Sequence, residues 1–175
     1  MNSDLNFAKA SLKRGDIGVL KTDTIYGLVG SALSEKTVKR IYTVRKRNPK
    51  KPFIILISSL RDLRLFGIIP SPRVRAVLKR VWPGPVSVIL PCENKHFSYL
   101  HRGTNSLAFR MPKKAALRQL LKATGPLVAP SANPEGLPSA NSVREAYAYF
   151  GGAIDFYVNS GNKKGTPSTI IEIKR

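Results

Sequence analysis

Short apolar runs that alternate with helix-length segments constrain the fold of this chain more than any other feature of its sequence. Apolar runs expected to form strands cover residues 17–22, 53–57, 86–90, 106–110, 127–129, 153–158 and 168–173. Helical periodicity and helix-end residues predict helices over 3–14, 34–47, 59–67, 71–81, 114–123 and 142–150. Such alternation is typical of an α/β domain.

These elements belong to one unit, because the 175 residues contain no internal repeat and no linker. A chain of this length can bury a core of its own. We therefore expect a single α/β domain over residues 1–175. The run 53–57 is apolar at every position, which favours a central strand. Residues 92–105 are expected to form a mobile polar loop.

Several classes of protein are excluded or disfavoured by composition. Cys92 is the only cysteine, so an internal disulfide and a cysteine zinc site are excluded. We expect no metal site at His96 and His101, which lie in the polar segment 92–105. No apolar run approaches the roughly 20 residues that span a bilayer, and the first fifteen residues lack the apolar core of a signal peptide. We expect a soluble, cytoplasmic protein without membrane contact.

Basic residues far outnumber acidic ones. The chain has 30 Lys and Arg against 10 Asp and Glu, a formal net charge of +20. Lys36 to Lys51 contains eight basic residues and no acidic one. This balance favours a polyanion or a multiply charged anionic ligand as the partner, with a merely basic surface as the alternative.

The stretch from Lys21 to Leu28, Lys-Thr-Asp-Thr-Ile-Tyr-Gly-Leu, follows the first apolar run. It places hydroxyls and a carboxylate at the end of an expected strand, before a turn at Gly27. Open α/β sheets bind ligands at the carboxyl ends of their strands. The alternative is a strand end closed by an Asx or ST turn, and these eight residues alone do not separate the two.

Cations and small hydroxyl or amide side chains gather near the ends of the expected strands. Arg45 follows Val38, Ile41 and Tyr42 on the apolar stripe of its helix, so we expect its guanidinium to point into a cleft rather than to snorkel into water. Guanidinium groups bind phosphate or carboxylate in a bidentate fork. The set suits phosphates and a small zwitterion; its members are Thr22, Thr24, Arg45, Arg47, Arg110, Ser131, Asn133, Ser139 and Ser168.

Other catalytic machinery is absent from the sequence. There is no G-x-x-x-x-G-K-[ST] phosphate loop, no G-x-G-x-x-G after a strand and no G-x-S-x-G elbow. Acidic residues are too few and scattered for paired-carboxylate hydrolysis. Phosphoryl and nucleotidyl transfer remain, since they rely mainly on positioning and electrostatic stabilisation.

Six motifs occur in an order that resembles the YrdC/TsaC family of threonylcarbamoyl-adenylate synthases. They are K-T-D-T-I-Y-G-L, R-x-R before a proline and an apolar strand, W-P-G-P, L-A-F-R-M-P, A-P-S-A-N and G-x-P-S-T-I-I. Together they run from about residue 17 to residue 173. One such motif would be weak support, whereas six in order make a strong resemblance.

The resemblance implies a YrdC-like domain, a twisted, open, mixed β-sheet with helices on its faces and a basic concave cleft. It also implies a reaction in which L-threonine, bicarbonate and ATP give threonylcarbamoyl-adenylate and pyrophosphate. Mg²⁺ is expected with the nucleotide rather than in a protein cage. Other proteins, possible members of a threonylcarbamoyl-transferase complex, then modify an adenosine beside the tRNA anticodon.

The resemblance also assigns roles to individual positions. Catalytic positions that also bind ATP are Arg45, Arg47, Ser131 and Asn133, and Ser106 and Ser139 are further ATP positions. Arg110 is expected on the threonine carboxylate. The full set of threonine positions is Thr22, Thr24, Tyr26, Arg110, Ala129 and Ser168.

The chain departs from the family pattern at three points. Arg45 replaces the usual lysine, and Asn48 before Pro49 leaves open a register in which Lys46 and Asn48 form the basic pair. Lys21 replaces a proline and is expected to add a cation to the cleft. Family members usually continue past the last strand with a further arginine near ATP, a place that Lys174 and Arg175 could take.

Two other functions stay open at this point. The net charge also fits a non-catalytic module that binds tRNA or double-stranded RNA in ribosome or tRNA maturation. A stand-alone relative of the carbamoyl-adenylate-forming domain of hydrogenase maturation is the less favoured possibility, because no zinc-finger cysteines accompany this domain.

Overall fold

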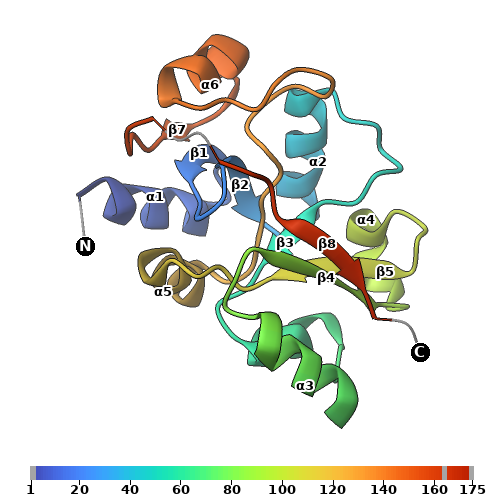
Figure 1. Cartoon of the computed structure of the whole chain (residues 1–175). Helices are drawn as coiled ribbons and strands as arrows, with labels where there is room; N and C mark the ends of the chain where they lie inside the picture. Colours follow the sequence, from blue (N-terminus) through green and yellow to red (C-terminus); the bar gives the residue numbers. More distant parts are fainter. Residues whose placement is uncertain (1–2, 163–164, 174–175) are drawn as a thin grey trace.

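The computed structural model describes residues 3–162 and 165–173, which form an eight-stranded mixed sheet with helices on its faces (Figure 1). The strand order is β7-β1-β2-β6-β3-β5-β4-β8. This arrangement confirms the predicted fold class. Strand β3 has neighbours on both sides near the middle of the sheet, as its uninterrupted apolar run predicts. No helix in the described ranges is both long and apolar enough to cross a membrane.

The strands are short and run in both directions. Their bounds are β1 Gly18–Lys21, β2 Tyr26–Ser31, β3 Ile54–Leu56, β4 Val86–Pro91, β5 Ser106–Arg110, β6 Leu127–Val128, β7 Phe156–Tyr157 and β8 Thr169–Glu172. β1 pairs antiparallel with β2, and β6 pairs antiparallel with both β2 and β3. β3 and β5 are parallel.

The helices begin and end at residues whose chemistry explains their limits. Their bounds are α1 Ser3–Arg14, α2 Glu35–Arg45, η1 Leu60–Phe66, α3 Pro72–Val81, η2 Lys95–Phe97, α4 Ser98–His101, α5 Ala115–Thr124, α6 Val143–Phe150 and η3 Gly151–Ala153. Ser34 caps α2 by accepting a hydrogen bond from the Thr37 amide. Ser71 caps α3 in the same way, and Pro72 follows at its first turn.

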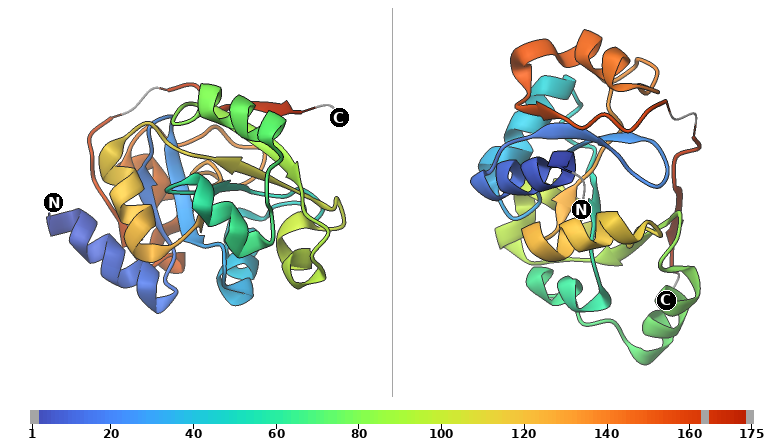
Figure 2. Two further views of the ribbon diagram at one scale, coloured as in Figure 1. Left: turned by 90° about the horizontal axis from the view of Figure 1, so that it is seen from below. Right: turned by 90° about the vertical axis from the view of Figure 1, so that its left-hand side faces the viewer.

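Two apolar clusters lie on opposite faces of the sheet. Helices α1 and α5 cover one face, where Leu12 and Leu120 pack with Leu20 and Leu56. The other face is covered by α2, η1, α3, α4 and α6 around a larger cluster that includes Phe66 and Phe109. Figure 2 shows α1 and α5 side by side in both views.

The segment 92–105 corrects the expectation of a mobile polar loop. It contains η2 and α4, and the side chains of Phe97, Tyr99 and Leu100 are buried. The Tyr99 hydroxyl donates to the Ala32 carbonyl at 3.0 Å. His101 is buried too, and its Nδ1 accepts from the Gly103 amide. The apolar side chains of this segment anchor it to the core.

Gly30 of β2 offers a test of the core packing. A Cβ at this position would lie 2.6 Å from the Thr37 Cγ2 atom and 2.9 Å from the Ile17 Cγ2 atom. Gly30→Ala should therefore lower the free energy of unfolding by about 1–3 kcal/mol, as measured by chemical denaturation. Gly152→Ala is the control, because nothing lies within 4 Å of a Cβ there. Equal stabilities of the two variants would contradict the packing.

Candidate functional site

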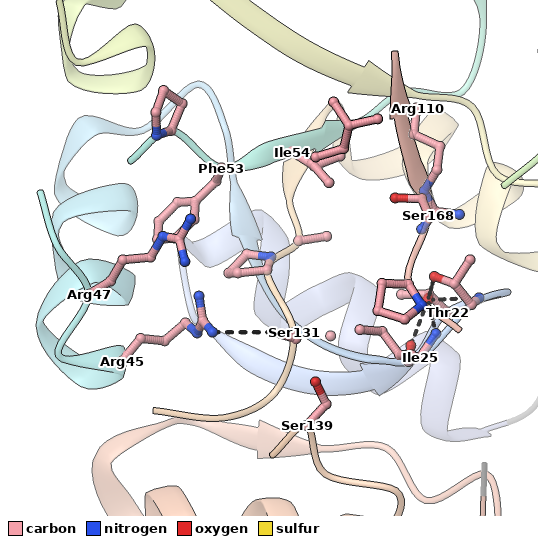
Figure 3. A pocket seen from close by; sticks show the side chains of 17 residues that line it. Thr22, Ile25, Arg45, Arg47, Phe53, Ile54, Arg110, Ser131, Ser139 and Ser168 are labelled. Carbon is pink, nitrogen blue, oxygen red and sulfur yellow. Dashed lines mark hydrogen bonds between the residues drawn. The ribbon is translucent and has the colours of Figure 1, made fainter. Parts of the chain in front are cut away.

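A pocket of about 240 Å³ lies between the β1–β2 turn, the end of α2 and the segment leading into β8. Figure 3 shows Arg45 and Arg47 on one side of it and Thr22, Arg110 and Ser168 on the other. The full lining comprises Thr22, Thr24, Ile25, Gly27, Arg45, Arg47, Pro52, Phe53, Ile54, Arg110, Ala129, Pro130, Ser131, Ser139, Pro167, Ser168 and Ile170. Both sides of the pocket thus carry guanidinium and hydroxyl groups, Ser131 beside Arg45 and Thr22 and Ser168 with Arg110.

The pocket collects most of the residues that the sequence singled out. Nine of the predicted residues line it: Thr22, Thr24, Arg45, Arg47, Arg110, Ala129, Ser131, Ser139 and Ser168. Tyr26, Ser106 and Asn133 are not among the lining residues. The pocket does not lie at a shared carboxyl end of neighbouring strands, where the sequence predicted the site. β1 and β6 run opposite to β3 and β5, so their carboxyl ends lie at different edges, and the residues meet over the face of the sheet.

Arg45 is held rigidly at the inner end of the pocket. Its side chain is buried, and its Nε donates to the Asn133 carbonyl at 2.8 Å. Its Nη2 donates to the Ser131 Oγ at 3.2 Å and to the Asn133 Oδ1 at 3.3 Å. Burial, with a smaller contribution from the Arg47 charge, lowers the pKa of Arg45 to about 10. Arg45 therefore keeps its positive charge at neutral pH.

Asn133 acts behind the pocket rather than in it. Its Nδ2 donates to the carbonyls of Pro134 at 2.8 Å and Leu137 at 2.7 Å, while its Oδ1 faces Arg45. This set of contacts fixes the loop after β6 and aims the Arg45 guanidinium. In this structure Asn133 therefore positions Arg45, and the direct contact with ATP that the resemblance implies stays a prediction.

Arg47 lies at the mouth of the pocket on an aromatic support. Its guanidinium carbon is 5.4 Å from the Phe53 ring centroid, and Phe53 stacks on Tyr42 at 4.1 Å. Arg102 covers the other face of this pair, 4.8 Å from the Tyr42 centroid. Lys46 and Asn48 are exposed and do not line the pocket. The geometry therefore favours Arg45 and Arg47 as the basic pair.

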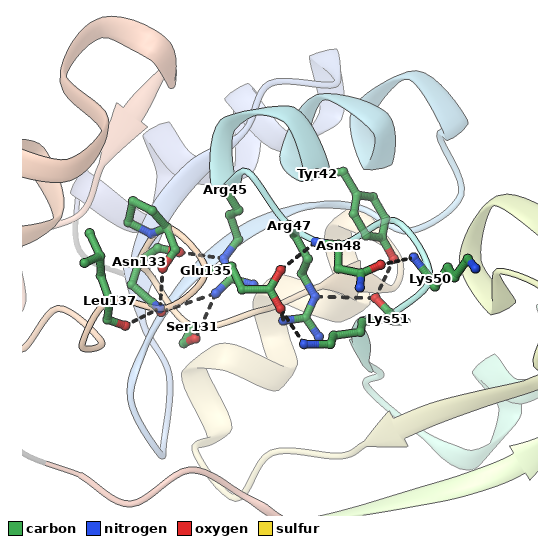
Figure 4. A network of polar contacts seen from close by, with 11 residues as sticks. Tyr42, Arg45, Arg47, Asn48, Lys50, Lys51, Ser131, Asn133, Glu135 and Leu137 are labelled. Atoms are coloured by element: carbon green, nitrogen blue, oxygen red, sulfur yellow. Dashed lines mark hydrogen bonds and ion pairs between the residues drawn. The ribbon is translucent and has the colours of Figure 1, made fainter.

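Glu135 ties down the basic loop that follows α2 (Figure 4). Its carboxylate accepts hydrogen bonds from the Asn48 amide and from Lys51 Nζ, the latter at 2.7 Å, and lies 4.0 Å from Arg47. The Lys51 hydrogen bond, followed by the Asn48 amide, lowers the pKa of Glu135 to about 2. Glu135 lies 84 residues from Lys51, and no local sequence pattern links the two.

The Glu135 contacts predict a pH-dependent contribution to stability. A carboxylate whose pKa falls from 4.5 to about 2 on folding stabilises the folded state above pH 4.5, and this stabilisation is lost as the pH falls toward 2. Glu135→Gln should therefore reduce the free energy of unfolding at pH 7 and have no effect near pH 2. Urea denaturation over this pH range measures the difference. A difference that grows as the pH falls would contradict this role.

Arg110 lines the opposite wall of the pocket and pairs with Asp23. Its Nη1 donates to the Asp23 carboxylate, which also accepts from the Lys113 amide at 2.9 Å. The Arg110 side chain is only 4% exposed. Its Nε is buried and has no hydrogen-bond partner among the described residues. A buried donor of this kind is costly unless a ligand accepts from it.

The turn between β1 and β2 combines both interpretations of its sequence. The Thr22 hydroxyl donates to the Ile25 carbonyl at 2.6 Å and accepts from the amides of Thr24 and Ile25 at 3.2 Å. This is the ST turn of the alternative interpretation. The same turn carries Thr22, Thr24 and Ile25 into the pocket wall. Local turn chemistry therefore shapes the site.

Tyr26 and Lys21 hold the segment that follows β7. The Tyr26 hydroxyl donates to the Gly161 carbonyl at 2.6 Å and accepts from the Ser160 amide. Lys21 Nζ donates to the Ser160 carbonyl at 2.8 Å and to the Asn162 carbonyl at 3.3 Å. Lys21 is thus not the pocket cation that its position in the motif predicts. Further along, Ser168 is 2.9 Å from Ser87 between their Oγ atoms.

Ser106 lies on the same face of the sheet as the pocket but at the far end of β5. Ser106 and Arg110 are four residues apart and point to the same side, because side chains alternate along a strand. Their separation is about 13 Å. Ser106 is therefore outside the pocket, in line with it along β5.

The chemistry of the pocket is that of an anion-binding site. In residues 3–162 and 165–173, no group of three or more His, Cys, Asp or Glu side chains could hold a metal ion. Lys174 and Arg175, considered above as nucleotide contacts, lie outside the described residues. The fold and the pocket define an α/β protein with a pocket whose two arginine-bearing walls suit anionic ligands.

The chain belongs to the Sua5/YciO/YrdC family, whose model, described as telomere recombination, matches residues 10–175. It is 33% identical to the threonylcarbamoyl-AMP synthase of Marinobacter nauticus over 97% of this chain and 90% of that protein. It is 32% identical to the threonylcarbamoyl-AMP synthase of Pyrococcus abyssi, over 97% of this chain and 50% of that protein.

A solved structure supports the same relationship. The P. abyssi Sua5 protein complexed with L-threonine superposes with a TM-score of 0.88 at 31% identity, over 97% of this chain and 50% of that one. The chain thus spans about half the length of this relative, whereas it covers most of the M. nauticus protein.

Proposed function

We propose that this protein is a threonylcarbamoyl-adenylate synthase that joins L-threonine, bicarbonate and ATP and releases pyrophosphate. Relatives that carry this name, including one matched over 90% of its length, support the assignment. The product is a precursor for threonylcarbamoyladenosine in tRNA, which other proteins, such as a transferase complex, would complete. We further propose that this takes place in the cytoplasm, where tRNA and ATP meet.

The observation that carries the proposal is the unpartnered Arg110 Nε across the pocket from Arg45 and Arg47. The buried Nε donor suits the carboxylate of an amino acid. The two arginines on the other side suit phosphates. A pocket of about 240 Å³ is smaller than the roughly 300–1,000 Å³ typical of sites for drug-sized ligands, so a nucleotide would extend beyond it. The face of β5 toward Ser106 offers that path.

The proposed chemistry needs no side-chain nucleophile. The amine of threonine and bicarbonate first form a carbamate with loss of water. A carbamate oxygen then attacks the α-phosphorus of ATP, and the bond to the bridging oxygen breaks to release pyrophosphate. Arg45 and Arg47 would stabilise the charge on the phosphate oxygens during transfer. Mg²⁺ would enter with the nucleotide and neutralise part of the same charge.

Pyrophosphate release tests the proposal. Pure protein supplied with Mg²⁺, ATP and bicarbonate should release pyrophosphate when threonine is added and should release almost none without it. Release with carbamoyl phosphate in place of threonine would instead favour the hydrogenase-maturation type of reaction. A folded protein that shows neither activity would favour a module that only binds RNA.

A further inference from the structure

A second cationic groove lies between η1 and α3, on a part of the molecule that the proposed reaction does not use. Its lining comprises Leu60, Arg61, Arg64, Ile69, Pro70, Arg75 and Lys79. None of these residues lines the functional pocket. Figure 1 shows α3 below the sheet, whereas α2, which carries Arg45, lies in the upper half of the molecule.

Two rows of cations form the walls of the groove. Arg61 and Arg64 are three residues apart on η1, and Arg75 and Lys79 are four residues apart on α3. Residues at these spacings lie on one helix face, with Cβ atoms about 5–6 Å apart. Between the rows, Ile69 is 76% exposed and forms an apolar floor with Leu60 and Pro70.

The charge of the groove is not neutralised from within the chain. Residues 59–81 contain six basic residues and one acidic residue, Asp62. The Asp62 carboxylate accepts hydrogen bonds from the amides and hydroxyls of Ser58 and Ser59 at the start of η1. Among the described residues, no ion pair involves Arg61, Arg64, Arg75 or Lys79.

We propose that this groove binds the phosphate backbone of RNA. Repeated cations on both walls match a strand that carries one negative charge per nucleotide, and arginine binds phosphate in a bidentate fork. The exposed apolar floor offers contact to the sugars that lie between the phosphates. The net charge of +20 supplies a long-range attraction to the same partner.

The test compares two charge-reversal variants by fluorescence anisotropy with a labelled transfer RNA. R75E/K79E should weaken binding at least tenfold. It should also reduce the slope of log affinity against log salt by about 1.4–1.8, because two phosphate contacts are lost and each contributes roughly 0.7–0.9. The control K9E/K13E changes the charge equally, at the same spacing, on α1. It should retain affinity within about twofold.

Several outcomes would overturn the proposal. These are wild-type protein that does not bind RNA, equal losses in the two variants, or a groove that binds anionic phospholipid vesicles or an acidic peptide but not RNA. If R75E/K79E does not fold by circular dichroism, R75Q/K79Q replaces it, with an expected loss of at least threefold. Threonine-dependent pyrophosphate release should be unchanged in these variants. A failed groove and a failed active site are therefore distinguishable.

Discussion

Arg110→Ala should reduce kcat/KM for threonine at least about thirtyfold in the pyrophosphate assay. Loss of one partner from a buried, hydrogen-bonded charge pair costs about 2–5 kcal/mol, and each 1.4 kcal/mol is a factor of ten. Arg110 is buried, and its free Nε is the donor that we assign to the threonine carboxylate. The KM for threonine should rise, and the KM for ATP should stay nearly unchanged.

The Asp23 pair requires a control, because Arg110→Ala also leaves a carboxylate without its guanidinium. Arg110→Lys keeps the charge but replaces the planar fork with a point charge, so it should recover the fold and only part of the threonine affinity. Denaturation curves of both variants separate unfolding from lost binding. An Arg110→Lys variant with full affinity for threonine would contradict the assignment.

Arg47→Ala should lower kcat/KM for ATP at least tenfold. The Arg47 side chain is 22% exposed and packs over Phe53, so denaturation curves must show that the variant keeps its fold. The loss should come from a missing charge-assisted contact to phosphate. Initial rates over a range of ATP concentrations measure it.

Lys50→Ala is the matched control for Arg47→Ala, since Lys50 is an exposed cation of the same loop and does not line the pocket. Its removal lowers the net charge by the same amount. It should change kcat/KM for ATP less than twofold. Equal effects of the two variants would mean that Arg47 acts only through the general field of the protein.

Local signals predicted many of the elements well. The capping serine and proline at residues 71–72 set the start of α3, and the apolar run 106–110 coincides with β5. β2 was missed, because Gly27 was interpreted as a turn residue. Gly27 lies in the strand instead, and further along β2 Gly30 has no room for a side chain against Thr37 and Ile17. Such packing is tertiary and leaves no mark in the local pattern.

The candidate site likewise contains residues that the sequence predicts and contacts that it does not. Residues whose chemistry suits an anion, such as Arg45 and Arg110, were predicted from sequence and line the pocket. The residue that orients Arg110 was not predicted, because the contact joins distant parts of the chain. Asp23, which pairs with Arg110, lies 87 residues from it in the sequence. The predicted contact of Asn133 with a ligand stays a prediction; the fold of its loop directs its amide to Arg45 and to two carbonyls, which the sequence did not indicate.

Transfer of labelled bicarbonate into a nucleotide product tests most directly whether one pocket joins an amino acid to a triphosphate. With ATP, threonine and Mg²⁺ present, we predict a labelled adenylate that forms in equal amount with pyrophosphate and disappears when either substrate is omitted. A folded protein that releases pyrophosphate without incorporating the label, or that forms no adenylate under these conditions, would contradict the account.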